Sequence, residues 1–177
     1  MVNCEVNNIK ASCKIKGEDT PRKLKELASH HNSVTKKKSN FFVLREKFVY
    51  VIFYTGHVNI TGAKSRDAIN EACSDLSVIL NKLDLTLSRL IIDNICLSGS
   101  LPHTLNLVTF SNQLLQDCVN FSFNPRKFPG LSFPSTKQSS GTTIVFTSGK
   151  FIIVGLKHEE AIRDAKSQLL GFADRAK

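Results

Sequence analysis

The sequence predicts an α+β fold in which two similar repeats build an antiparallel sheet with helices. Two observations support this prediction. The stretch FYTGHVNITGAKSRDAI begins at Phe53 and is matched by FTSGKFIIVGLKHEEAI, which begins at Phe146. An upstream pair, VNNIKAS from Val6 and IDNICLS from Ile92, follows the same order. Each copy reads as strand, tight turn, strand and helix. We therefore predict a first repeat over residues 5–86 and a second over residues 87–176, joined in one continuous domain.

Each repeat is expected to contain a short and a long helix. The first short helix begins after Asp19, because Pro21 suits a first helical turn and apolar residues then recur at helical spacing. Its counterpart begins near Pro102 and carries Leu105, Val108, Phe110, Leu114 and Leu115. Ser65 is a good N-cap for a long helix that carries Ile69, Ala72, Cys73, Leu76, Ile79, Leu80 and Leu83. The second long helix carries Ile162, Ala165, Leu169 and Phe172.

Two of the expected strands, Phe48–Phe53 and Phe151–Val154, are apolar at every position. Strands of this kind usually have cover on both faces. A sheet with helices on one face only would leave the other face apolar and open, and such a surface is typical of a binding site. The sequence is therefore compatible with a partner on this face, with a three-layer core, or with an obligate dimer.

Charge and cysteine content narrow the class of protein. The 177 residues carry a formal net charge of +9, with clusters at Lys36–Lys38 and Arg126–Lys127, which suits a polyanionic partner without requiring one. The five cysteines show no C-x-x-C and no histidine at ligand spacing, so we expect no disulfide framework, metal or other cofactor. No apolar run suits a leader or approaches the ~18 residues of a membrane span. We expect an intracellular protein with no membrane partner.

Several motifs carry a resemblance to a known family. They are RKFPGL from Arg126, VFTSGK from Val145, TGAKS from Thr61, the Asn-Ile pairs at Asn8 and Asn94, and LPHTLNLVTFS from Leu101. With these motifs the chain resembles the conserved core of the TATA-box-binding protein family from about Val6 to Phe172. The resemblance implies two pseudo-symmetric repeats that form a saddle-shaped, curved antiparallel β-sheet with four helices on the convex face.

The resemblance also implies a function. Members of this family act as DNA-binding general transcription initiation factors, which lie on the minor groove of A/T-rich double-stranded DNA, bend it with inserted phenylalanines and nucleate a preinitiation complex. The implied partners are transcription factor IIB-like and IIA-like proteins, or replacements for them, and the RNA polymerase machinery. The implied location is the nucleus or another intracellular compartment that contains DNA.

The family's DNA-contacting positions are carried over residue by residue. The second repeat has the wedge pair Phe128 and Phe146, with Pro129 beside the first. In the first repeat Phe53 matches, but the other wedge position falls on Lys37 unless a gap brings Phe41 or Phe42 there. The base-edge asparagines match Asn8 and Asn94. The apolar floor matches Val49, Val51, Thr61, Cys96, Thr142, Ile144, Ile152 and Val154, whereas Lys10 and Asn59 replace the family's valine. Candidate phosphate contacts are Arg45, Thr55, Ser148 and Lys150.

Partner-facing positions depart further from the family. Where the family presents two glutamates to transcription factor IIB, this chain has Asn124 and Arg126, a charge reversal that disfavours a partner built for an acidic patch. An enzyme is not indicated, because Ser148 and Thr55 lie in turns without a positioned base. The serious alternatives are a protein-interaction module on the same scaffold, or a domain that binds RNA or an RNA–DNA hybrid, each with weakened DNA binding.

Overall fold

The computed structural model describes residues 3–136 and 141–175, which fall into two compact units. We call Asn8–Asp93 the first unit, and the stretch up to Asn7 together with the residues from Asn94 on the second unit. The predicted repeat boundaries at residues 86 and 87 remain a prediction, and residue 176 lies outside the described part. The two units are described separately below.

The first unit is an antiparallel sheet with the strand order β2-β3-β4-β5-β1, in which β6 pairs with the other end of β1. Strand β1 belongs to this unit from Asn8 onward. Its elements in chain order are β1 (Asn3–Lys16), α1 (Thr20–His30), β2 (Val34–Lys37), β3 (Phe41–Arg45), β4 (Val49–Phe53), β5 (His57–Ala63), α2 (Arg66–Asn81) and β6 (Thr86–Leu87).

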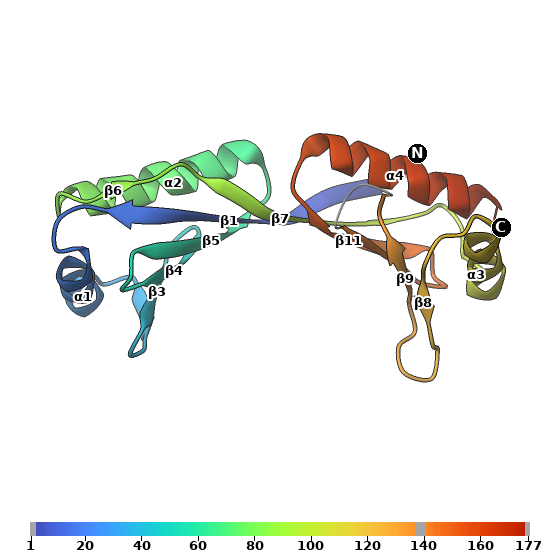
Figure 1. Ribbon diagram of the computed structural model, residues 1–177, viewed down its shortest axis with the longest axis horizontal. Coiled ribbons are helices and arrows are strands. Elements are labelled where there is room, and N and C mark those ends of the chain that lie inside the picture. The colour runs from blue at the N-terminus through green and yellow to red at the C-terminus, as the bar shows by residue number, and fades with distance from the viewer. Residues whose placement is uncertain (1–2, 137–140, 176–177) are drawn as a thin grey trace. The chain divides into compact units, whose positions relative to one another are not determined.

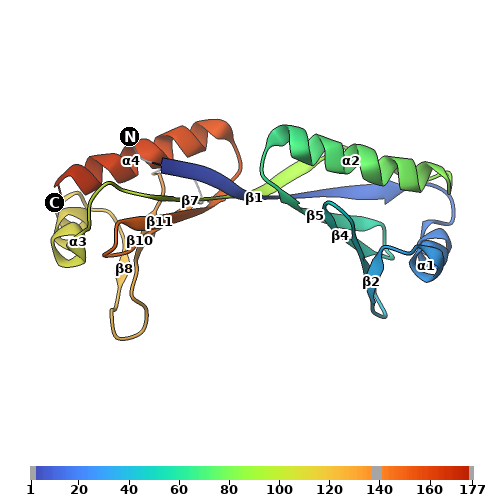
Figure 2. The ribbon, with the colours of Figure 1, turned by 180° about the vertical axis from the view of Figure 1, so that it is seen from behind.

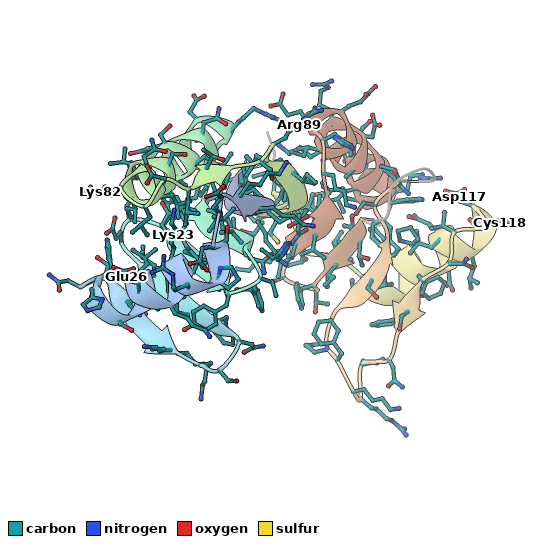
Figure 3. The ribbon with its side chains drawn as sticks, turned by 60° about the vertical axis from the view of Figure 1, so that its left-hand side comes forward. Lys23, Glu26, Lys82, Arg89, Asp117 and Cys118 are labelled. Carbon is teal, nitrogen blue, oxygen red and sulfur yellow. The ribbon has the colours of Figure 1, made fainter. Side chains whose placement is uncertain are left out.

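The second unit repeats this plan with the strand order β7-β11-β10-β9-β8. Its elements are β7 (Ile91–Ser100), α3 (Leu107–Gln116), β8 (Ser122–Phe123), β9 (Leu131–Pro134), β10 (Thr142–Val145), β11 (Lys150–Leu156) and α4 (Glu159–Arg175). The Asn7 amide donates to Ser98 Oγ at 2.7 Å within this unit. Asp117, labelled after α3 in Figure 3, accepts from Arg175 at the end of α4 at 2.7 Å.

Burial alternates along the strands, because each unit has helices on one face only. In β4, Tyr50 and Ile52 are buried whereas Val49, Val51 and Phe53 are half-buried. Figures 1 and 2 show α2 lying along the strands of the first unit and α4 along those of the second. The uninterrupted apolar strands therefore cover a core on one face and leave a second apolar face, which we call the open face. Within the described residues neither unit therefore has the three-layer core that the sequence left possible.

The starts of α1 and α2 follow the sequence, whereas α3 begins at Leu107 and not near Pro102, and its predicted apolar stripe is wrong in part. Ser65 is the N-cap of α2, and its side chain accepts from the Ala68 N–H. Asn106 caps α3 in the same way. Val108 and Leu115, which the sequence placed on the apolar side of this helix, are 61% and 62% exposed. The helix begins at Leu107, so its core-facing residues are Leu107, Phe110, Ser111 and Leu114.

Equivalent tight turns join β4 to β5 and β10 to β11. Gly56 and Gly149 have φ angles of 88° and 80°, a region that side chains with a Cβ rarely adopt. The Gly56 carbonyl accepts from Ile15 N–H at 2.7 Å, and the Gly149 carbonyl accepts from Leu101 N–H at 2.9 Å. A Cβ at Gly56 would approach the Ile15 carbonyl oxygen to 2.8 Å. Both repeats therefore require glycine where the turn packs against a neighbouring strand.

Candidate nucleic-acid interface

The floor of the open face in the first unit follows from the strand register. Residues that lie directly opposite one another on paired strands share a face. One row across the open face runs through Ser12, Asn59, Val51, Val43 and Lys36. A second row runs through Thr61, Val49 and Arg45. The structure thus brings the predicted Val49, Val51, Asn59 and Thr61 together, and it adds Val43, which the sequence reasoning missed.

The second unit has the same rows with different side chains. One row runs through Ser98, Ile152, Ile144, Ser132 and Ser122. The other runs through Val154, Thr142 and Pro134. All four predicted floor residues of this unit's hairpin, Thr142, Ile144, Ile152 and Val154, lie in these rows. Ile152 is 37% exposed, so the floor offers apolar surface that no described residue covers.

An aromatic pair stands beside each floor. In the second unit the rings of Phe128 and Phe146 lie 5.9 Å apart, edge to face, and Phe128 is 46% exposed. Pro129 is also exposed and follows Phe128 directly. In the first unit the rings of Phe41 and Phe53 lie 5.6 Å apart. Each unit therefore presents two phenylalanines at its hairpin end.

Of the residues that the sequence left open for the first wedge position, the structure favours Phe41 over Lys37 and Phe42. Lys37 lies opposite Phe42 at the end of β2, and its ammonium donates to Ser29 Oγ at 2.8 Å. The Lys38 N–H donates to the Phe41 carbonyl at 2.8 Å, which closes a short turn and begins β3 at Phe41. Phe41 then lies directly opposite Phe53, whereas Phe42 points into the core and is fully buried. The shorter hairpin brings an in-strand phenylalanine to the place that a loop phenylalanine fills in the second unit.

Asn8 and Asn94 have matching environments. The register of β1 against β5 shifts between Ile9 and Ala11, and that of β7 against β11 shifts near Gly155, as at a β-bulge. The bulges free the N–H groups of Gly62 and Gly155 from the strand ladder. Gly62 N–H donates to Asn8 Oδ1 at 2.8 Å, and Gly155 N–H donates to Asn94 Oδ1 at 2.6 Å.

These bonds fix which end of each carboxamide is available. With Oδ1 accepting from the backbone, and in Asn8 also from the Thr61 hydroxyl at 3.0 Å, the Nδ2 group is left as a donor. Asn94 Nδ2 contacts Cys96 Sγ at 3.1 Å, which uses one of its two hydrogens. Both side chains therefore direct the carbonyl oxygen at the bulge and keep N–H hydrogens that can donate to a ligand.

Lys10 and Cys96 occupy equivalent places, each opposite the two bulge residues of the neighbouring strand. Lys10 is exposed and Cys96 is half-buried. The ammonium of Lys10 has no ion pair or hydrogen bond to any residue that the structure describes. The first unit thus has a free positive charge where the second has a small apolar thiol.

The candidate phosphate ligands lie around the hairpins. Thr55 and Ser148 occupy matching turns and are exposed, as are Arg45 and Lys150. The Ser148 hydroxyl accepts from Lys150 N–H at 3.4 Å. Lys36 ends the first row of the open face and is a further candidate, which the register reveals and the sequence did not. The roles of these residues remain predictions.

The candidate partner residues lie in the loop that precedes Phe128. Asn124 and Arg126 are both exposed. The Asn124 carbonyl accepts from the N–H groups of Lys127 and Phe128 at 2.9 and 3.0 Å, so the loop has defined turn geometry. Its side chains present positive rather than negative charge, as the sequence predicts. Within the described residues, no His, Cys, Asp and Glu gather in a group that could hold a metal ion, and none of the helices there is long and apolar enough to cross a membrane.

Comparison with known proteins gives a consistent result. The family model described as transcription factor TFIID, or TATA-binding protein, matches residues 3–83 and 89–172. The TATA-box-binding protein of Thermococcus sibiricus is 31% identical over 132 residues, which cover 73% of this chain and 69% of that protein. The protein of the same name from Thermococcus celer is 31% identical over 70% of this chain and 65% of its own length.

A solved structure shares the fold. The Methanococcus jannaschii TBP matches with a TM-score of 0.78 and 24% sequence identity, over 98% of this chain and 99% of that one. The predicted fold class, with two repeats, an antiparallel sheet and helices on one face, is thereby confirmed. The family match also favours the predicted DNA-binding role over an interaction module or an RNA-binding domain. The chain belongs to the TATA-binding protein family of transcription factors.

Proposed function

We propose that this chain is a DNA-binding transcription initiation factor that lays its open faces on the minor groove of A/T-rich duplex DNA, bends the duplex, and nucleates a preinitiation complex. The observation that carries the proposal is the pair of oriented asparagines. In the minor groove an A·T pair presents only acceptors, adenine N3 and thymine O2. Asn8 and Asn94 direct their carbonyl oxygens at the Gly62 and Gly155 N–H groups, which leaves their Nδ2 groups as donors for such acceptors.

The apolar floor and the aromatic pairs support bending. An apolar surface cannot replace the hydration of a narrow groove by hydrogen bonds, so it binds best when the groove opens and the bases unstack. Phe128 and Phe146 in the second unit, and Phe41 and Phe53 in the first, are placed to enter base steps as wedges. Burial of one such ring contributes about 1.5–3 kcal/mol, which offsets part of the cost of unstacking.

Phosphate contacts complete the proposal. We assign them to Arg45, Thr55, Ser148 and Lys150, and we add Lys36. The hydroxyls of Thr55 and Ser148 and the backbone of their turns suit phosphate oxygens, and the three cations supply charge-assisted bonds. A net charge of +9 favours association with a polyanion at low salt.

A binding experiment tests the function. Full-length protein is titrated into a labelled A/T-rich duplex and into a G/C-rich duplex of equal length, and the bend is followed by fluorescence transfer between the duplex ends. We expect tighter binding to the A/T-rich duplex together with a rise in transfer. Protein that neither retains nor bends any duplex at low salt would exclude the proposal and favour an interaction module.

We further propose that transcription factor IIB-like and IIA-like proteins, or replacements for them, and the RNA polymerase machinery assemble on the DNA-bound chain, and that the location is nuclear where a nucleus exists. Asn124 and Arg126 make the IIB-like contact unusual, because a partner evolved for acidic residues is repelled by Arg126. Changing both residues to glutamate should strengthen recruitment of a standard factor IIB to the preassembled DNA complex. Arg89→Glu, at an exposed site labelled in Figure 3, controls for net charge. Equal recruitment by wild type and the double variant would show that this loop is not the contact.

A further inference from the structure

The two open faces carry different side chains at one central position where the strand pairing is the same. Asn59 lies between Ser12 on one neighbouring strand and Val51 on the other. Ile152 lies between Ser98 and Ile144 in the same manner. Register places these two side chains at equivalent points of the two floors. One is an amide with a donor and an acceptor, and the other is a branched hydrocarbon.

The Asn59 amide is not used by the fold. It makes no hydrogen bond to any residue that the structure describes, unlike Asn8 and Asn94, whose carbonyl oxygens are held by backbone N–H groups. It is half-buried on the open face, beside apolar Val51. A polar group placed on an apolar binding surface costs free energy on complex formation unless the ligand satisfies it. The ligand surface that faces Asn59 must therefore offer a complementary group.

Among base pairs, only G·C offers a donor to the Asn59 carbonyl oxygen in the minor groove. Its edge adds the guanine N2 amino donor to the acceptors that every pair presents. Asn59 Oδ1 can accept from that amino group while Nδ2 donates to a neighbouring acceptor. Ile152 can do neither, so a guanine amino group beneath it would be buried as a donor without an acceptor. Lys10, the other residue that replaces the family's valine, has donors only and cannot accept from guanine.

We propose that Asn59 is a specificity-determining residue that lets the half-site beneath the first unit contain one G·C pair, whereas Ile152 restricts the half-site beneath the second unit to A·T. This inference rests on the proposed DNA-binding function and deepens it. It gives the binding site a direction, because the unit that tolerates G·C must lie over the half that contains it. The bend and the A·T preference elsewhere follow from the shared apolar floor.

The test uses full-length protein and a palindromic A/T-rich duplex with a G·C pair in neither half, in one half, or symmetrically in both halves. The substituted position is moved stepwise along the half-site. At the position facing residue 59, wild type should bind the duplexes with no or one G·C pair about equally, and the duplex with two about tenfold more weakly. Because the parent duplex is palindromic, the protein can bind in either orientation and will place its first unit over the half that contains G·C.

Two exchanges between the repeats provide the matched variants. Asn59→Ile should lower the affinity for the one-pair duplex about tenfold relative to the A/T-only duplex. Ile152→Asn should instead raise the affinity for the two-pair duplex to that for the one-pair duplex. Affinities are compared only as ratios within each variant, so a general change in binding cancels. Thermal unfolding confirms that each variant is folded, and if Ile152→Asn does not fold, Asn59→Ile alone decides.

Inosine isolates the amino group. An inosine·cytosine pair lacks the N2 amino group of guanine and matches A·T in the minor groove, so it should restore the affinity of Asn59→Ile for the one-pair duplex. The proposal is overturned if wild type and Asn59→Ile show the same affinity ratios at every position. It is also overturned if inosine does not restore the affinity of Asn59→Ile for the one-pair duplex. Failure of wild type to bind even the A/T-only duplex would instead overturn the proposed function, and this inference with it.

Discussion

The two repeats reach one arrangement of aromatic rings by two routes. In the second unit Phe128 lies in the loop before β9, and its ring covers Gly130, where an added Cβ would meet it at 2.7 Å. In the first unit Phe41 lies in β3 itself, directly opposite Phe53. The ring separations are nevertheless 5.9 and 5.6 Å. What the repeats share is the location of the ring pair on the sheet and not the position of each ring in the sequence.

The repeats also divide into parts that differ and parts that do not. The glycine turns, the bulges at Gly62 and Gly155, and the asparagines bonded to them are matched in geometry. The floor residues differ in chemistry, with Lys10 and Asn59 in one unit against Cys96 and Ile152 in the other. The geometry of these turns and bulges is compatible with few residue types. A half-exposed side chain of the floor contributes little to the stability of the fold, so its identity can change with the ligand.

The largest effects should come from removing the rings. Phe41→Ala and Phe128→Ala should each weaken binding to an A/T-rich duplex by about 1.5–3 kcal/mol, roughly 10- to 150-fold, and reduce its bend. The thermal stability should change little for Phe128→Ala, because its ring is 46% exposed. Leu115→Ala, which removes a more exposed apolar side chain from α3, is the control. A normal bend with Phe41→Ala would mean that the first repeat does not use its ring pair.

The asparagines should have the next largest effects, and similar ones in both repeats. Asn8→Ala and Asn94→Ala each remove a donor aimed at the groove and leave a glycine N–H without its acceptor. We expect each change to weaken DNA binding by about 1–3 kcal/mol and to lower the free energy of unfolding by about 1 kcal/mol. Gel shifts and urea unfolding measure the two quantities. Loss of stability without loss of affinity would assign these side chains to the fold alone.

A smaller difference should appear in the salt dependence. Exchange of the equivalent residues, Lys10→Cys and Cys96→Lys, removes or adds one cation on the open face. The slope of log affinity against log salt should become shallower by about one for Lys10→Cys and steeper by about one for Cys96→Lys. Titrations from low to physiological salt measure both. Identical slopes for all three proteins would show that the Lys10 ammonium does not interact with the phosphates.

A separate prediction concerns alkaline stability. Cys13 is buried in the first unit, and burial together with the neighbouring Cys73 raises the pKa of its thiol to about 11. The folded state thus holds the proton above the ordinary pKa of 9.0. Its contribution is complete below pH 9 and is lost as the pH rises to about 11, at roughly 1.4 kcal/mol per pH unit.

Gly99 has the equivalent register in the second unit, so that unit has no thiol at this point. Cys13→Ala should make the free energy of unfolding fall less steeply between pH 9 and pH 11. Urea unfolding at several pH values, compared with wild type, measures the change in slope. An unchanged slope would show that Cys13 titrates in the folded protein as it does in the unfolded chain.

Features that depend on local or repeated chemistry could be predicted from the sequence. Ser65 as an N-cap, Gly56 and Gly149 as turn residues, and the asparagine pair all follow from residue type and duplication. The exact length of the hairpin between β2 and β3 could not, because Lys37, Phe41 and Phe42 all fit a strand. Only the closing bond from Lys38 to Phe41 determines which phenylalanine reaches Phe53.

The exposure of two apolar side chains on α3 could not be predicted from the sequence either. Val108 and Leu115 continue an apolar pattern, yet they lie on the solvent side because the helix starts at Leu107. The internal role of the Asn8 and Asn94 carbonyl oxygens depends on bulges that appear only when the strands are paired. The sequence thus predicts which residues lie on the open face, and strand register was needed to say which atoms they present.

The division of the chain into units has a consequence for synthesis on the ribosome. The first unit is contiguous, so all of Asn8–Asp93 has emerged well before translation ends. The second unit combines the residues up to Asn7 with those from Asn94 on, so the whole first unit is translated between its two parts. Asn7 must therefore wait until Ser98, its hydrogen-bond partner, has been made. The nascent chain is expected to fold its first unit before the second is complete.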